Sequence, residues 1–359
     1  MPDLVLRRVA LRRVLALPRP LLRLACGGGA MIQGGRTLDA RLQFLACRAK
    51  MRPPISSLTP SEARLAVAET ERMLDGPVEP GVAIETLTLA SEIGPIPARA
   101  YRPADQDPAA PTLVFAHGGG GVVGDIASSQ AFASTLAAVL RGPVLSVGYR
   151  LAPENRFPAP LDDMMAALRW TRANGGRFGA PAGRVAIGGE CLGANLAAVV
   201  CQELRSRGEA QPDLQLLLYP LTDIASETPS MRLYADAWPL GRATLDWFMG
   251  HYLGPGDSPA DPRLSPLKAP DLTGLAPAVI ATAGFDPLVD QGEAYARALE
   301  GAGVPVVYRC YDNLAHGFAA FTGVMGRTAR DAAVGAPTAS AACHEIATLA
   351  RGLIEGRPA

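Results

Sequence analysis

This 359-residue chain lacks an excess of charge of either sign, because Lys+Arg and Asp+Glu both number 34. Nucleic-acid-binding proteins usually concentrate basic residues on one face, so a nucleic-acid partner is not expected. The balance also gives no indication of a polyanionic substrate. Histidine is scarce, with four residues in all, which leaves few candidates for a base that works near neutral pH.

Cysteine occurs without the spacing of a disulfide framework or a metal site. None of the six forms a CxxC pair or a cluster with histidine; they are Cys26, Cys47, Cys191, Cys201, Cys310 and Cys343. A structural zinc site needs clustered ligands, and disulfide scaffolds are typical of small secreted chains. We therefore expect no metal and no disulfide scaffold, and a cytoplasmic location is the default.

A long uninterrupted hydrophobic run is also missing, although the first 30 residues are rich in Leu and Val. Six arginines interrupt this stretch, whereas a signal peptide needs an unbroken apolar segment and a spanning helix needs about 20 apolar residues. We expect residues 1–37 to be a disordered or mis-started leader, with Met31 as an alternative start. An amphipathic surface helix that touches a membrane or a partner is a second interpretation, and an export signal is a third.

From residue 82 onward, short apolar runs alternate with stretches of helical periodicity. Two half-buried strands are expected at 82–89 and 96–101, followed by continuous apolar runs at 112–116, 144–147, 185–187, 214–219, 278–281 and 304–308. Helical stretches lie between most of them, at 130–140, 161–171, 192–205 and 293–300. This alternation predicts an α/β fold with a mostly parallel sheet covered by helices on both faces. Active sites in such sheets lie at the carboxyl ends of strands.

Residues 38–80 precede this core and have a helical pattern, in which Thr59 and Glu62 have the spacing of a capping box. We expect these N-terminal helices to contribute to a cap over the substrate pocket. Residues 81–359 would then form the α/β core.

The connection between the expected strands at 214–219 and 278–281 is more than fifty residues long. A structureless loop of that length is uncommon, so we predict a helical cap inserted at about 221–265. Trp238 and Phe248 of this insertion are candidate substrate contacts. The alternative is that its aromatic residues form the cap's own core.

The strongest local motif is Gly189-Glu190-Cys191-Leu192-Gly193, which follows an apolar strand and opens a helix. A strand, a sharp turn and a helix form the context of a nucleophile elbow, which lifts the central side chain toward the pocket. The N–H groups and dipole of the helix start would stabilise a thiolate. The alternative is that Cys191 is a small buried hydrophobic residue behind a glycine-rich turn.

A second glycine-rich motif, 117–121, directly follows another expected strand. Glycines let the backbone approach a ligand and direct successive N–H groups at one oxygen. We predict that the N–H groups of Gly118, Gly119 and Leu192 form an oxyanion hole. Phosphate binding is the alternative, but no lysine follows and no GxGxxG spacing opens a helix. Further residues expected near the substrate are Gly120, Gly121 and Glu190.

Elimination favours His316 as the base. Of the other histidines, His117 belongs to the glycine motif, His251 to the expected cap and His344 to the final helix, whereas His316 follows a late strand. The orienting carboxylate is expected after the preceding strand, where Asp286 stands.

Two other carboxylates compete with Asp286. Asp290 has Glu293 three residues further on and is interpreted as a helix cap, and Asp312 is close to His316 in sequence. The chain order Cys191, Asp286, His316 is that of α/β-hydrolase triads.

The chain resembles the hormone-sensitive-lipase-like family of α/β-hydrolase esterases. The matching stretches, in family order and spacing, are HGGGGVVGD (117–125), YRLAPENRFPAPLDD (149–163), GGECLGANLAA (188–198), LSPL (264–267), TAGFDPLVDQGEAYARAL (282–299) and AHGF (315–318). The resemblance covers roughly residues 38–355. It implies a Cys191–Asp286–His316 triad, oxyanion donors at Gly118, Gly119 and Leu192, no cofactor, and short to medium acyl chains bound under a helical cap.

The elbow departs from the family pattern Gly-Asp-Ser-Ala-Gly-Gly at four of its six positions. Cysteine stands for serine, with Glu190, Leu192 and Ala194 at the other three. Dienelactone hydrolases show that this fold can work with a cysteine nucleophile. Gly121 replaces the bulky aromatic residue usual in the family, which would leave more room beside the oxyanion loop.

We therefore expect a hydrolase of carboxylic esters or lactones that acts through a Cys thioester. An acyltransferase or thioesterase is the alternative, because thioesters react with amines and thiols as well as water. A catalytically silent ligand-binding hydrolase fold is a further alternative. The expected partner is a small ester or acyl compound. A homodimer stays open, and leader contact with a membrane is a minor option.

Overall fold

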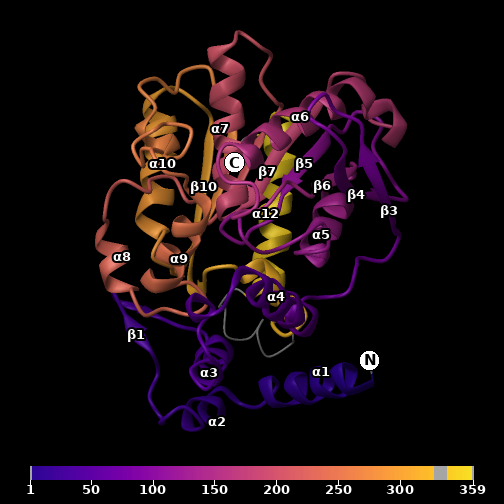
Figure 1. Cartoon of the computed structure of the whole chain (residues 1–359). Coiled ribbons are helices and arrows are strands. Elements are labelled where there is room, and N and C mark those ends of the chain that lie inside the picture. Colours follow the sequence, from indigo (N-terminus) through magenta and orange to yellow (C-terminus); the bar gives the residue numbers. More distant parts are fainter. Residues whose placement is uncertain (1, 327–337, 358–359) are drawn as a thin grey trace.

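The computed structural model describes residues 2–326 and 338–357 and shows an α/β fold built on one large sheet (Figure 1). The sheet has eight strands in the order β10-β9-β8-β7-β5-β6-β4-β3. Their bounds are β3 Val82–Leu89, β4 Ile96–Pro103, β5 Thr112–Ala116, β6 Val144–Val147, β7 Val185–Glu190, β8 Gln215–Leu218, β9 Ala278–Phe285 and β10 Val306–Ala315. The predicted fold class is confirmed.

The sheet is parallel from β6 through β10 and antiparallel at the edge formed by β4 and β3. Every residue of β5, β6, β7 and β8 is buried, which explains why these strands are continuous apolar runs in the sequence. Edge strand β3 is mostly exposed and alternates instead. The carboxyl ends of the parallel strands therefore meet at one edge of the sheet. Sheets covered by helices on both faces usually carry their active site at that edge.

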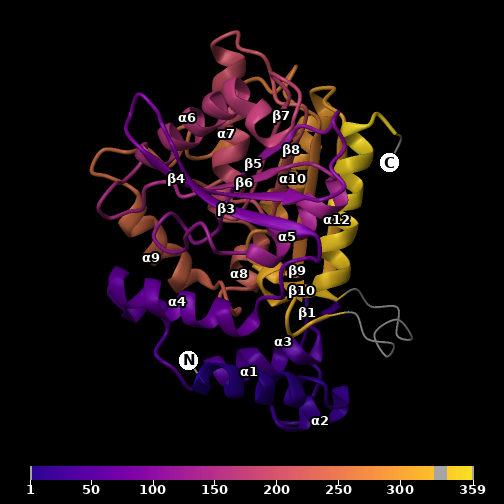
Figure 2. The ribbon, with the colours of Figure 1, turned by 90° about the vertical axis from the view of Figure 1, so that its right-hand side faces the viewer.

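Helices cover both faces of the sheet (Figures 1 and 2). On one face α5 (Gln130–Leu140) packs against α12 (Ala339–Ile354). The other face is lined by α6 (Ala159–Asn174), α7 (Leu192–Ser206) and α10 (Val289–Gly301). Helix α7 is buried along most of its length beneath β7 and β8, so its first residue is held rigidly at the sheet edge.

Two helices and a short hairpin precede the core, where the sequence favoured a disordered or mis-started leader. They are α1 (Pro2–Leu15), α2 (Arg19–Leu24) and the pair β1 (Ile32–Gln33) and β2 (Arg36–Thr37). Leu15 of α1 and Leu22 of α2 are buried, and α2 packs on α3 (Ala40–Ala49). No helix among the described residues is both long enough and apolar enough to span a bilayer.

Helix α4 (Pro60–Leu74) follows and begins at the predicted capping box. The Thr59 hydroxyl accepts from the Glu62 N–H, and the Glu62 carboxylate accepts from the Thr59 N–H at 2.9 Å. In Figure 2, α4 lies below the segment that joins β8 to β9. That segment contains α8 (Pro229–Leu233), α9 (Arg242–Tyr252) and the 3₁₀ turn Pro266–Lys268.

Candidate active site

Cys191 stands at the sharp turn between β7 and α7, as the elbow motif predicts. Its backbone has φ 54° and ψ −117°. L-residues rarely adopt a positive φ, and such strained conformations are found in functional turns. The side chain is almost fully buried, and the Cys191 N–H donates to the Leu218 carbonyl at the end of β8. The thiol is thereby fixed at the start of a helix, at the carboxyl edge of the sheet.

The two glycines of the elbow are required by close backbone packing. A Cβ atom on Gly193 would collide with the carbonyl oxygens of Ala116 and His117, and one on Gly189 would collide with the backbone of Gly193. Strand β5, the elbow and α7 therefore approach one another more closely than side chains allow. This approach brings the glycine motif that follows β5 next to Cys191.

Gly118 lies beside the nucleophile position, since a Cβ atom built on it would be 3.7 Å from the Cys191 Cβ. Gly119 has φ 108° and accepts at its carbonyl from the N–H groups of Val122 and Val123, so the loop turns back on itself. Among the described residues, no protein group accepts a hydrogen bond from the N–H of Gly118, Gly119 or Leu192. Three backbone donors near one thiol thus stay available to a ligand.

The expectation of extra room at Gly121 is wrong. A Cβ atom on Gly121 would lie 2.7 Å from both the Leu192 Cδ2 atom and the Tyr252 ring, so these two side chains fill the space. Tyr252 is the last residue of α9 and is fully buried. The leucine of the elbow and the tyrosine of α9 together take the place of the missing aromatic side chain.

Phe248 of α9 also reaches the glycine loop, because a Cβ atom on Gly120 would collide with its ring. Phe248 is buried and packs edge-on against Trp247. Trp238 lies elsewhere, with its ring centroid 5.5 Å from that of Phe321 in the turn that follows His316. Phe248 therefore packs on the glycine loop, and Trp238 packs on the turn that follows His316.

His316 follows β10 and is held by Asp286, which follows β9. The ring Nδ1 is 2.7 Å from the Asp286 Oδ2, and the other carboxylate oxygen accepts from the Leu288 N–H at 2.8 Å. Asp286 is fully buried and His316 nearly so. A carboxylate fixed on Nδ1 directs the opposite nitrogen of the ring, Nε2, away from it.

Burial and two neighbouring groups set the pKa of His316. Burial alone would lower that pKa, but Asp286 and Cys191 raise it to about 10. The raised pKa means that the imidazole holds its proton at neutral pH. The ring also packs on Tyr219, with 4.8 Å between the ring centroids.

The competing carboxylates are placed away from the ring. Asp290 lies in the first turn of α10, one residue inside the helix rather than at its cap, and accepts from the Ser230 N–H at 2.7 Å. Asp312 is exposed and pairs with Arg36 of β2 at 2.8 Å. The structure therefore brings only Asp286, of the three candidates, into a hydrogen bond with His316.

The remaining histidines have structural contacts. His117 stacks on Tyr149 with 4.3 Å between ring centroids, its Nδ1 is 2.7 Å from the Gly118 carbonyl, and burial lowers its pKa. His251 packs on Trp247, and the Nε2 atom of His344 on α12 lies 3.6 Å from the Glu79 carboxylate. These placements agree with the elimination that favoured His316.

Glu190, which precedes Cys191 at the end of β7, is buried. Its Oε2 accepts from the Tyr219 hydroxyl at 2.8 Å, whereas its Oε1 is buried and has no hydrogen-bond partner within residues 2–326 and 338–357. Burial raises the pKa of Glu190 to about 7. Sequence reasoning missed Tyr219, which directly follows β8 with φ 37°, donates to Glu190 and packs on the His316 ring. Its positive φ gives no signal in the sequence.

Two further anchors were also missed. Arg64 of α4 donates to the carbonyls of Val122 and Ala152, each at 2.8 Å, and pairs with Glu154. Helix α4 is thus fastened to the loop that carries Gly118 and Gly119. Asn195 of α7 donates to the carbonyls of Leu221 and Leu264, at 2.7 and 2.8 Å. The elbow helix therefore holds both ends of the segment that contains α8 and α9.

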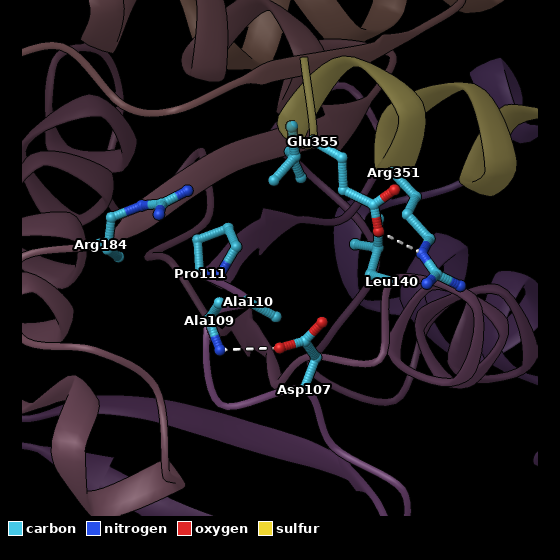
Figure 3. A pocket seen from close by; sticks show the side chains of 9 residues that line it. Asp107, Ala109, Ala110, Pro111, Leu140, Arg184, Arg351 and Glu355 are labelled. Carbon is cyan, nitrogen blue, oxygen red and sulfur yellow. Dashed lines mark hydrogen bonds and ion pairs between the residues drawn. The ribbon is translucent and has the colours of Figure 1, made fainter. Parts of the chain in front are cut away.

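A hollow of about 140 Å³ lies at the opposite edge of the sheet, near the amino ends of β5 and β7 (Figure 3). It is lined by Asp107, Pro111, Arg184 and the end of α12, where Arg351 pairs with Glu355 at 2.7 Å. Ligand pockets for organic molecules usually measure about 300 Å³ or more. None of the residues around Cys191 lines this hollow, so we do not assign the site to it.

Comparison with known proteins agrees with the geometry. A model of the alpha/beta hydrolase fold family matches residues 113–320. Carboxylic ester hydrolase LipN of Mycobacterium tuberculosis is 41% identical over 310 residues, covering 84% of this chain and 82% of LipN. Ethyl acetate hydrolase of Pseudomonas putida is 38% identical over 269 residues, covering 74% and 85%. The solved structure of ester-hydrolase EH1AB1 from the Lake Arreo metagenome has a TM-score of 0.80 at 35% identity, covering 94% and 98%.

Proposed function

Because the chain belongs to the α/β-hydrolase fold family and is a carboxylesterase-type hydrolase by its relatives, we propose that it cleaves carboxylic esters or lactones with Cys191 as nucleophile. In this proposal His316 is the acid and base, and Asp286 orients it. Gly118, Gly119 and Leu192 donate to the oxyanion.

One observation carries the proposal. Cys191 stands at the strained elbow, and it helps to raise the pKa of His316, whose Nδ1 is 2.7 Å from the Asp286 Oδ2. A buried cysteine with a merely structural role needs neither a strained backbone nor a charged imidazole beside it. The three unpaired N–H groups near the thiol support the same conclusion.

In the proposed first step, the Cys191 thiolate attacks the ester carbonyl carbon and the carbonyl electron pair moves to oxygen. The N–H groups of Gly118, Gly119 and Leu192 stabilise that oxyanion. As the carbon–oxygen bond to the alcohol breaks, the Nε2 proton of His316 passes to the leaving alkoxide. The products are an alcohol, a neutral imidazole and a thioester on Cys191.

In the second step, His316 Nε2 takes a proton from water while the water oxygen attacks the thioester. Collapse of this second oxyanion breaks the carbon–sulfur bond and releases the carboxylic acid. The thiolate and the imidazolium are thereby restored. Asp286 holds Nδ1 throughout, so the ring keeps the tautomer that both steps require.

Acyl transfer is the second candidate, and the cysteine itself favours it. A thioester reacts with amines and thiols more readily than an oxygen ester does, so an acceptor other than water can complete the reaction. The burial of Cys191, with Phe248 and Tyr252 packed against the neighbouring glycine loop, limits access of bulk water. The choice between water and another acceptor decides between a hydrolase and a transferase.

The test is to trap the acyl enzyme on purified full-length protein with a short-chain chromogenic ester. Intact-mass analysis should show an acyl adduct that maps to Cys191 and that hydroxylamine removes, as expected for a thioester. Cys191→Ala should lose both the adduct and turnover, and His316→Ala should lose turnover. Cys47→Ala, which changes a half-buried cysteine on α3, is the matched control and should retain both.

Product analysis with added amine, alcohol or thiol acceptors separates the two candidate reactions. Free acid as the dominant product supports hydrolysis, and acylated acceptor supports transfer. Retained turnover in Cys191→Ala would contradict the nucleophile. Neither adduct nor turnover on a panel of esters, lactones and thioesters would leave a ligand-binding role and would refute the enzymatic proposal.

A further inference from the structure

Exposed hydrophobic residues are concentrated at the N-terminal end of the chain. The described residues include twelve exposed large hydrophobic side chains, and seven of them fall within residues 6–32: Leu6, Val9, Leu17, Leu21, Leu24, Met31 and Ile32. Leu6 and Leu24 are 69% and 68% exposed. Singly scattered apolar residues are normal on a soluble surface, but such a concentration marks a contact surface.

Five of the exposed apolar residues lie on α1, on α2 or, for Leu17, in the connection between them. In Figure 2 these helices form the end of the molecule beyond α4, on the side where α8 and α9 also lie. Leu15 points inward and is buried, whereas Leu6 and Val9, three residues apart, share the exposed side of α1. We call Leu6, Val9, Leu17, Leu21 and Leu24, with Arg12 and Arg13, the leader face.

Basic residues accompany the apolar ones on this surface. Residues 1–32 contain six arginines and one acidic residue, although the whole chain has no net charge. Some of these arginines hold the helices to the core: Arg7 pairs with Glu69, and Arg8 donates to the Asp75 carbonyl. Arg12 and Arg13 are exposed on α1 beside Leu6 and Val9.

We propose that the leader face docks on an anionic phospholipid surface. An interfacial helix buries its apolar side chains at the boundary between headgroups and acyl chains, and flanking arginines pair with lipid phosphates. Arginine suits this role because its stem covers apolar surface while its guanidinium stays with the phosphate. The net positive charge of this one segment favours an anionic bilayer over a neutral apolar partner.

The docking does not need to penetrate deeply. The apolar residues extend over both short helices rather than along one long hydrophobic segment, so the helices would lie in the plane of the surface. Helix α1 packs on α4, and Arg64 of α4 is fastened to the glycine loop beside Cys191. A docked leader face would therefore hold the candidate active site close to the membrane surface.

Vesicle co-sedimentation of the purified full-length protein tests the proposal. Vesicles of phosphatidylglycerol and phosphatidylcholine should sediment the protein at low salt, and pure phosphatidylcholine vesicles should not. Arg12→Gln/Arg13→Gln should lower the partition coefficient on the order of 10-fold or more, because each basic residue near an anionic surface contributes measurably. Leu6→Ser/Val9→Ser should lower it similarly.

The matched control is Ile84→Ser/Ile93→Ser, which removes two exposed apolar side chains near the distant edge strand β3. This control should sediment as the unmodified protein does, and circular dichroism should show that all variants are folded. Absence of sedimentation with anionic vesicles would overturn the proposal, as would equal binding to both vesicle types. A dimer that dissociates in Leu6→Ser/Val9→Ser without vesicle binding would assign the face to a second copy instead.

Discussion

Replacing Glu190 by glutamine should stabilise the protein by an amount that grows as pH rises from about 4.5 to about 7. Burial raises the pKa of Glu190 from 4.5 to about 7, and its Oε1 has no hydrogen-bond partner. Between pH 4.5 and 7 the native state therefore binds a proton that the unfolded state has lost, so stability falls as pH rises through this window. Glutamine has nearly the same shape and carries no charge to bury.

The magnitude follows from the difference between the two pKa values. About 2.5 pH units correspond to about 3 kcal/mol of unfolding free energy, fully expressed above pH 7 and absent below pH 4.5. The Tyr219 hydroxyl, which donates to Glu190 at 2.8 Å, can donate to the glutamine carbonyl instead. The variant and the unmodified protein should therefore be about equally stable at pH 4.5.

Urea unfolding at pH 4.5 and pH 8, followed by tryptophan fluorescence, measures the effect. Every other titrating group is shared by the two proteins, so the change in their difference with pH isolates Glu190. Glu300→Gln, at an exposed position near the end of α10, is the control and should shift neither midpoint. A Glu190→Gln difference that is the same at both pH values would refute the reasoning.

Three further outcomes are expected. Cys191→Ala should lower the pKa of His316 by about 1 to 3 pH units from its value near 10, because it removes a group that raises this pKa. NMR of the histidine ring measures the change, and an unchanged pKa would show that Cys191 does not interact with the His316 ring. In the unmodified enzyme, kcat/KM should fall as pH rises through about 10, because the imidazolium that protonates the leaving group is lost; a profile still rising there would contradict that role. Gly193→Ala should destabilise the fold by at least about 3 kcal/mol through backbone collision, whereas Gly250→Ala, in open space on helix α9, should be neutral or slightly stabilising in the same thermal melts.

The central sheet could be predicted because its information is local. Strands buried on both faces are continuous apolar runs, and β5 and β6 begin and end where those runs do. The alternating pattern at 82–89 likewise matches the bounds of edge strand β3. The expected strand at 304–308 only overlaps β10, which begins at Val306 and continues to Ala315 through the polar residues Asp312 and Asn313. Pairing with β9 supports that extension, and a pairing partner cannot be deduced from periodicity.

In the candidate site, too, residues specified by local sequence could be predicted, and residues that depend on distant partners could not. Cys191, Asp286 and His316 are predictable because each follows a strand, and parallel strands bring their carboxyl ends together. Tyr219 and Arg64 are not, because each acts through partners 29 to 90 residues away in sequence. Gly121 shows the same limit, since the space beside it is filled by Tyr252, which the motif that contains Gly121 does not specify.

Glu190 lowers the stability of the folded protein at neutral pH, and its position suggests what it contributes in return. A buried carboxyl group whose Oε1 has no partner among the described residues costs free energy at neutral pH, yet this one stands next to Cys191, the proposed nucleophile. The positive charge of His316 lowers the pKa of Glu190, so by linkage an ionised Glu190 favours the protonated imidazole in return. Through Tyr219, the same carboxylate also supports one side of the His316 ring. A Glu190→Gln protein that is more stable at pH 8 should therefore have a lower His316 pKa and an earlier alkaline fall in kcat/KM. Unchanged histidine titration in that variant would show that the carboxylate only lowers stability and has no part in holding the proton.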